Sequence, residues 1–116
     1  MLQMISSDSV KGFYFDRDKA IEELFIASKK LSELYNDVIE VRLFGSFAEG
    51  EETGTSDFDI IIVTESLEEN PVERAKPYYF FMAGELKISL DLIAIGKSEI
   101  ANYSDIIKKS ISIYHR

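Results

Sequence analysis

The chain has 116 residues, no cysteine and a formal net charge of −8, which predicts one domain, 1–116, and excludes disulfide bonds and thiolate metal sites. Hydrophobic residues make up 46% of the sequence, but no apolar run is long enough to span a membrane, so we expect no membrane partner. Residues 33–73 contain twelve carboxylates and a single cation, Arg42, so we expect no direct nucleic-acid partner, because phosphates are bound by Lys and Arg.

The N-terminal third of the chain predicts an arm followed by a long helix. Residues 1–15 show no clean period and are predicted to form an irregular arm or a short helix. The helix begins at Asp16 or Asp18, either of which can cap it, and ends near Asn36. Its apolar stripe has the helical spacing of a core-facing side and comprises Ile21, Leu24, Ser28, Leu31 and Tyr35.

Two strands are predicted in the middle of the chain. Residues 38–44 alternate between apolar and charged side chains, which indicates a strand with one buried face. Residues 58–63 form a continuous apolar run, which is typical of a central strand that is buried on both faces. The polar residues 51–56 between these two runs predict a loop, with Gly54 as its most flexible point.

A second helix is predicted from Asn70, which caps it, to about Gly84. Pro71 fits the first turn of this helix, whereas Pro77 either kinks it or divides it in two. The run Tyr78–Met82 contains four aromatic residues. We expect this run to pack against the sheet, with an exposed partner-binding patch as the alternative.

The C-terminal third predicts a strand, a helix and a short final strand. Residues 86–95 alternate in polarity, which indicates a strand with Asp91 on its less apolar face. Ser98 or Ser104 caps a last helix, and residues 111–114 add the final strand. This order of elements predicts an α/β (α+β) fold, a small sandwich whose mixed, twisted sheet of three to four strands carries helices mainly on one face.

Two aspartates at the start of the central strand are the strongest candidates for a functional site. Asp57 and Asp59 are two residues apart on a strand, so both side chains leave the same face with their Cα atoms roughly 6 to 7 Å apart. An unpaired buried carboxylate costs several kcal/mol, and a divalent cation would remove the repulsion between the two. We therefore favour metal binding over the alternative, in which Asp57 is a turn residue and Asp59 pairs with a lysine.

Ser46 permits two interpretations. Its hydroxyl and the N–H groups that follow it would hold nucleotide phosphates, because Gly45-Ser46 leads into a predicted helical turn. Alternatively, Ser46 and Glu49 would form a capping box for a helical turn that begins at Phe47. We favour the phosphate role because the aspartate pair follows in the sequence.

The ordered set Gly45-Ser46, a spacer and Asp57-Phe58-Asp59 resembles the signature of the DNA polymerase beta-like nucleotidyltransferase superfamily, and in particular its minimal nucleotidyltransferase (MNT) branch. Asp91, between two leucines, fits the third carboxylate of that branch, and residues 106–114 are similar to the way the branch ends. The resemblance covers roughly residues 17–115 and implies the small nucleotidyltransferase fold.

The resemblance also implies an activity: transfer of AMP from ATP to a hydroxyl of a partner protein, with two Mg²⁺ ions. The implied catalytic and metal-binding residues are Asp57, Asp59 and Asp91, of which Asp91 also accepts or orients the proton of the acceptor hydroxyl. The implied nucleotide-binding residues are Gly45, Ser46 and Ser56.

The partner implied by the resemblance is a HEPN-domain toxin, with this chain as its antitoxin; a homodimer is a further possibility. The N-terminus lacks the pattern of a signal peptide, so we expect a cytoplasmic protein. Phe47 and Glu49 stand where many members of the family have arginine, and Glu49 would repel a triphosphate. Two alternatives therefore remain open: a weak or inactive antitoxin that acts by binding its partner, and a nucleotidyltransferase for small molecules.

Overall fold

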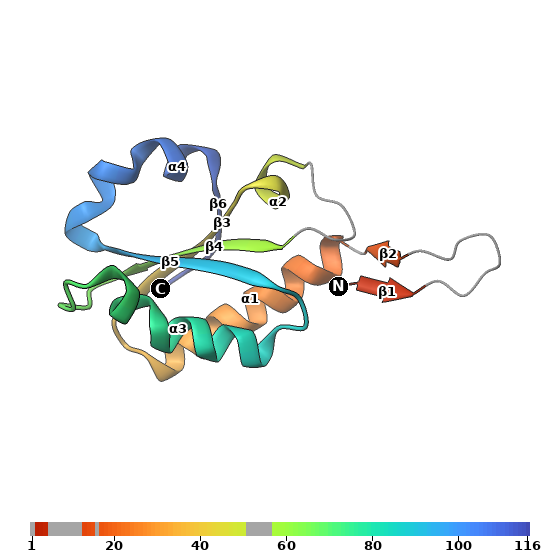
Figure 1. Ribbon diagram of the computed structural model, residues 1–116, viewed down its shortest axis with the longest axis horizontal. Coiled ribbons are helices and arrows are strands. Elements are labelled where there is room, and N and C mark those ends of the chain that lie inside the picture. Colours follow the sequence, from red (N-terminus) through yellow and green to blue (C-terminus); the bar gives the residue numbers. More distant parts are fainter. Residues whose placement is uncertain (1, 5–12, 16, 51–56) are drawn as a thin grey trace.

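The computed structural model describes residues 2–4, 13–15, 17–50 and 57–116. Its central sheet has four strands in the order β5-β4-β3-β6 (Figure 1). Strand β4 runs parallel to β5, whereas β3 is antiparallel to both β4 and β6, so the sheet is mixed as predicted. The strands are β3 Val38–Phe44, β4 Phe58–Thr64, β5 Leu90–Gly96 and β6 Ile111–His115.

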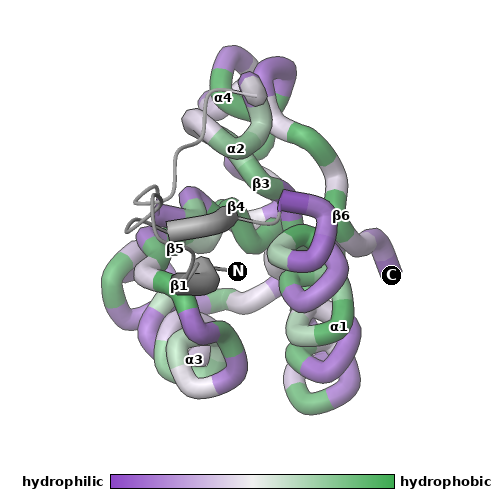
Figure 2. The backbone as a smooth tube through the Cα atoms, turned by 90° about the vertical axis from the view of Figure 1, so that its right-hand side faces the viewer, coloured by the Kyte–Doolittle hydropathy of each residue, from purple (hydrophilic) through white to green (hydrophobic). Residues whose placement is uncertain are grey.

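The two long helices cover one face of this sheet. Helices α1 (Arg17–Leu34) and α3 (Pro71–Glu85) lie side by side below it, and α2 (Ser46–Glu49) and α4 (Ser104–Lys109) lie above it (Figure 2). A 3-10 helix, η1 (Lys97–Tyr103), leads from β5 into α4. Among the described helices, none combines the length and the apolar character that crossing a membrane requires.

The main core lies between the sheet and the two long helices, and it follows from the sequence periods. The apolar stripe of α1 is buried at Ala20, Leu24, Ala27 and Leu31. Strand β4 is buried on both faces, as its continuous apolar run predicts: Ile60 and Ile62 face the long helices, and Ile61 and Val63 belong to a smaller cluster on the other side.

Helix α3 is one continuous helix. The Oδ1 atom of Asn70 accepts hydrogen bonds from the backbone N–H groups of Val72 and Glu73, at 2.9 and 3.1 Å, so the predicted cap is confirmed. Pro71 occupies the first turn, and Pro77 lies inside the helix without dividing it. The aromatic run divides between two environments, because Tyr78 and Met82 are buried in the core whereas Tyr79 and Phe80 are exposed.

Several predicted boundaries differ from the structure. Strand β5 begins at Leu90 instead of residue 86, because Leu86 ends α3 by donating its N–H to the Met82 carbonyl. Neither predicted serine caps the last helix: η1 already begins at Lys97, and Ser104 is the first residue of α4, with no side-chain cap. Helix α1 ends at Leu34, two residues before its predicted end.

The N-terminal arm carries two short strands instead of the irregular chain or short helix expected. Strands β1 (Leu2–Met4) and β2 (Phe13–Phe15) pair with each other in antiparallel orientation and form a sheet separate from the four-stranded one (Figure 1). The predicted cap Asp16 and the predicted loop 51–56 lie outside the described residues.

Candidate functional site

Two of the three predicted carboxylates are direct neighbours across the sheet. Asp59 on β4 is paired in register with Asp91 on β5. Adjacent strands lie about 4.8 Å apart and paired residues share a face, so the two side chains leave the sheet side by side. Asp57 precedes Asp59 by two residues and lies next to the start of β4. The carboxylates thus lie at the end of the sheet where β4 and β5 begin and β3 finishes.

The pKa of Asp59 reflects both its burial and the two carboxylates beside it. Asp59 is half-buried, whereas Asp57 and Asp91 are exposed. Burial raises the pKa of the Asp59 carboxyl above its ordinary value, and the negative charges of Asp91 and Asp57 raise it further. The three groups therefore repel one another when ionised, which is the condition that a bound cation relieves.

Gly45 lies directly against Asp59, and only glycine fits at this position. Its backbone has φ 77° and ψ −151°, a conformation that residues with a side chain rarely adopt. A Cβ atom at this position would overlap with Oδ2 of Asp59 and would lie 3.0 Å from its Cγ. The end of β3 therefore packs its bare backbone directly against the Asp59 carboxylate.

Ser46 is the first residue of α2, and the capping-box interpretation of Ser46 and Glu49 is wrong. The residue at the cap position is Gly45, and no side chain donates or accepts a capping hydrogen bond. The turn is closed instead by the Glu49 N–H, which donates to the Gly45 carbonyl at 3.1 Å. The Ser46 hydroxyl is therefore not committed to a helix cap.

Phe47 and Glu49, the other two side chains of α2 that bear on the candidate site, have different surroundings. The Phe47 ring is fully buried and lies 4.7 Å from the Phe58 ring, between centroids, so it faces the core. Glu49 is exposed at the end of α2. Position 47 therefore fixes α2 to the core, and Glu49 leaves a negative charge near the candidate site.

A cation that the sequence analysis missed contacts the same turn. Nη2 of Arg17, the first residue of α1, donates a hydrogen bond of 2.6 Å to the Phe47 carbonyl. The two residues are thirty positions apart in the sequence, so no local pattern indicates this contact. Arg17 thus brings a positive charge to α2 from a neighbouring helix.

The donor set suits Mg²⁺, although it is not a closed metal site. Within the ranges that the structure describes, no group of three or more His, Cys, Asp or Glu side chains is arranged to hold a metal ion. Mg²⁺ prefers oxygen ligands and is usually bound by one or two carboxylates together with substrate phosphates. The register pair Asp59 and Asp91 fits that requirement. Ser56, the remaining predicted nucleotide ligand, lies outside the described residues.

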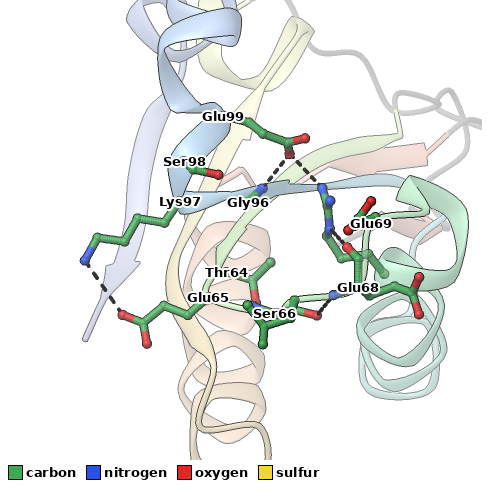
Figure 3. Close-up of a pocket in the computed structure, with 11 residues that line it drawn as sticks. Thr64, Glu65, Ser66, Glu68, Glu69, Gly96, Lys97, Ser98 and Glu99 are labelled. Atoms are coloured by element: carbon green, nitrogen blue, oxygen red, sulfur yellow. Dashed lines mark hydrogen bonds and ion pairs between the residues drawn. The ribbon is translucent and has the colours of Figure 1, made fainter.

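A cavity of about 860 Å³ lies at the end of the sheet opposite the candidate site, beyond the C-terminal ends of β4 and β5 (Figure 3). Arg74, only 7% exposed, donates to the carbonyls of Glu68 and Ala94 and to Oε1 of Glu99, at 2.8, 3.0 and 2.8 Å. The Gly96 N–H and, after it, the Arg74 guanidinium hold the pKa of Glu99 below its ordinary value. These groups satisfy one another, so we interpret them as a brace between α3 and η1.

Comparison with known proteins identifies the family to which the chain belongs. A sequence model of the family described as "Nucleotidyltransferase domain" matches residues 26–114, which include Gly45, Ser46 and all three aspartates. No curated protein matches the chain.

Three of the solved structures that are similar to this chain illustrate the shared fold. A Sulfolobus solfataricus protein described as a nucleotidyltransferase is 21% identical, with a TM-score of 0.67 over 86% of this chain and 84% of that one. A chain of a toxin–antitoxin complex with AMP-PNP is 20% identical, with a TM-score of 0.58 over 81% and 73%. A chain of the complex between a tri-AMPylated Shewanella oneidensis HEPN toxin and its MNT antitoxin is 13% identical, with a TM-score of 0.54 over 87% and 74%.

Proposed function

Because this chain belongs to the nucleotidyltransferase domain family, we propose that it transfers AMP from Mg²⁺-bound ATP to a hydroxyl of a partner protein. The observation that carries this proposal is the register pair of Asp59 and Asp91, of which Asp59 packs against the bare backbone of Gly45. The solved complexes with AMP-PNP and with an AMPylated HEPN toxin support ATP as the donor and a HEPN-domain toxin as the acceptor.

Each residue of the site has a role in this reaction. Asp57, Asp59 and Asp91 would hold the Mg²⁺ ions, which supply charge neutralisation of the triphosphate and stabilise the attacking and leaving oxygens. The Ser46 hydroxyl and the N–H groups of α2 bind the leaving phosphates. The acceptor oxygen bonds to the α-phosphorus, the bond between the α-phosphorus and the bridging oxygen breaks, and pyrophosphate leaves. Asp91, exposed on the edge strand, accepts or orients the proton of the acceptor hydroxyl.

One observation favours a second candidate function. Glu49 is exposed at the end of α2, and Phe47 faces the core, so neither position supplies a cation to a triphosphate. A chain with this deficit would neutralise a toxin by binding it, without transferring AMP. Stable complex formation without nucleotide, unaffected by changes at Asp59, is the signature of that function.

Intact-mass measurement separates the two functions. The candidate acceptor is the protein encoded beside this chain, incubated with it, ATP and Mg²⁺. Transfer predicts a mass gain of one or more AMP groups that is lost with Asp59→Asn. Asp105→Asn, in the first turn of α4, is the matched control and should retain the gain. An unchanged mass alongside a tight complex would instead establish the binding function.

A further inference from the structure

A shallow groove follows the outer edge of β5. Strand β5 is the last strand of the sheet and pairs only with β4 among the strands that the structure describes. The groove, of about 340 Å³, is lined by the outer side of α3 from Pro71 to Phe80, by residues 92–95 of β5 and by Tyr103. It lies on the same strand as Asp91, immediately after it in the sequence.

The groove is apolar and open to solvent. Phe80 is 68% exposed, Val72 64% and Tyr79 38%, and all three belong to α3. Lys76 also lines the groove, and its Nζ atom forms an ion pair with Oε2 of Glu73 at 2.8 Å. An exposed apolar surface of this kind indicates a binding partner that offers apolar side chains.

The edge of β5 lacks the usual protection of an exposed strand. Its sequence, Leu-Asp-Leu-Ile-Ala-Ile-Gly, contains neither lysine nor proline, and its register with β4 is regular. At its far end, Arg74 occupies the Ala94 carbonyl and Glu99 occupies the Gly96 N–H, each at 3.0 Å. The stretch nearest Asp91, from Leu90 to Ile93, has no such side-chain cover within the described part of the chain.

We propose that this groove docks an extended, apolar segment of the acceptor protein, which adds to the edge of β5 and brings its hydroxyl to Asp91. The inference rests on the proposed function, for which it names the acceptor's binding surface. A segment paired with the uncovered residues 90–93 would extend about 10 Å, at about 3.3 Å per residue, and would run beside Asp91. Backbone pairing would supply affinity, and the aromatic side chains of α3 would select apolar residues.

A second copy of this chain fits the groove less well. Each copy carries a net charge of −8, so two copies repel each other. Pairing of two β5 edges would also cover the approach to Asp91, which is exposed on that strand. A segment of the acceptor would form the same backbone hydrogen bonds with the edge of β5, and it would bring its own hydroxyl to Asp91.

The test compares charge insertion in the groove with the same change elsewhere. Phe80→Glu places a carboxylate in the groove at an exposed position, and Ile26→Glu does so on α1, where the side chain is 48% exposed. The acceptor is the protein encoded beside this chain. With saturating Mg²⁺ and ATP, Phe80→Glu should raise the KM for the acceptor at least tenfold. With saturating acceptor and varied ATP, it should leave the KM for ATP unchanged. Ile26→Glu should change neither constant, and amide exchange of β5 should slow when the wild-type chain binds the acceptor.

The outcomes distinguish this inference from the proposed function. An unchanged acceptor KM for Phe80→Glu overturns the docking proposal. So does a wild-type chain that is dimeric alone and becomes monomeric with Phe80→Glu, because the groove is then a self-interface. If the wild-type chain transfers no AMP, the proposed function has failed, and calorimetry without ATP still decides the docking. In that case a complex that Phe80→Glu abolishes supports the groove, whereas an intact complex, or none with the wild-type chain, overturns it.

Discussion

A Cβ atom on Gly45 would overlap with Oδ2 of Asp59, so the last residue before α2 and the second residue of β4 fit together only if one of them is glycine. This contact joins the two halves of the sequence motif, which are fourteen positions apart. It also explains why the glycine is needed for a reason beyond its positive φ: the Asp59 carboxylate occupies the volume of a side chain.

Gly45→Ala should therefore damage both stability and activity. The positive-φ backbone and the overlap with Asp59 predict a loss of about 1–3 kcal/mol in the free energy of unfolding. The rate of AMP transfer should fall by more than this loss of stability explains, because the added methyl group displaces the Asp59 carboxylate. Gly84→Ala is the control: nothing lies within 4 Å of the added Cβ, and it should be neutral or stabilising in chemical denaturation. Equal stability and equal AMP transfer of the two variants would contradict the contact between Gly45 and Asp59.

The stability of the protein should depend on pH through Asp59. Its pKa in the folded protein is raised above the unfolded value of 3.8, because burial and then the charges of Asp91 and Asp57 disfavour ionisation. A raised pKa contributes stability that is present below pH 3.8 and is lost as the pH rises through the folded pKa. Asp59→Asn removes this repulsion, so it should have a higher Tm than the wild type at pH 7.

The advantage of Asp59→Asn should shrink as the pH falls toward 3.8, measured by thermal melting without divalent cations. Added Mg²⁺ should raise the Tm of the wild type more than that of the variant, because only the wild type has the full set of carboxylates. A wild type that is the more stable of the two at pH 7 without Mg²⁺ would show that the three carboxylates do not repel one another.

Arg17 should support nucleotide binding through α2. Replacing it with Gln removes the hydrogen bond of 2.6 Å to the Phe47 carbonyl and one positive charge. A hydrogen bond to a charged group contributes about 1.5–3 kcal/mol to stability, so the Tm should fall. The lost positive charge beside α2 should also raise the Kd for Mg²⁺-bound ATP several-fold. Lys29→Gln removes one charge from an exposed position of the same helix and should leave the Kd unchanged. A lowered Tm with an unchanged Kd would assign Arg17 a purely structural role.

Glu49→Arg should strengthen nucleotide binding. The exposed Glu49 adds a negative charge beside the turn that would hold the phosphates. At about 4 Å, two unit charges interact by roughly 1 kcal/mol in water, so the reversal should lower the Kd for ATP several-fold. Glu33→Arg, at an exposed position near the end of α1, makes the same charge change and should have no effect at moderate salt. Calorimetric titration of both variants compares them directly.

The elements with strong sequence periods could be predicted almost to the residue. Strand β3 has the predicted bounds and β4 ends one residue later, because alternation and a continuous apolar run describe burial directly. Strand geometry also placed Asp91 on the less apolar face of its own strand, whereas its register opposite Asp59 is set by the pairing of β4 with β5.

What could not be predicted depends on contacts between distant residues or on one backbone angle. Leu86 is apolar because it is buried at the end of α3. The alternation that begins at residue 86 therefore did not mark the start of strand β5. Whether Gly45 or Ser46 caps α2 is decided by the φ of Gly45. The contact of Arg17 with Phe47 joins residues thirty positions apart and arises only in the folded chain, so nothing local predicts it.

The most direct test of the account uses ATP labelled at either the α- or the γ-phosphate, with Mg²⁺, the chain and the protein encoded beside it. AMP transfer predicts that the acceptor takes up label from the α-phosphate alone, and that Asp59→Asn abolishes the uptake while Asp105→Asn does not. Label from the γ-phosphate, or α-label that persists with Asp59→Asn, would contradict a nucleotidyltransferase site built on Asp57, Asp59 and Asp91.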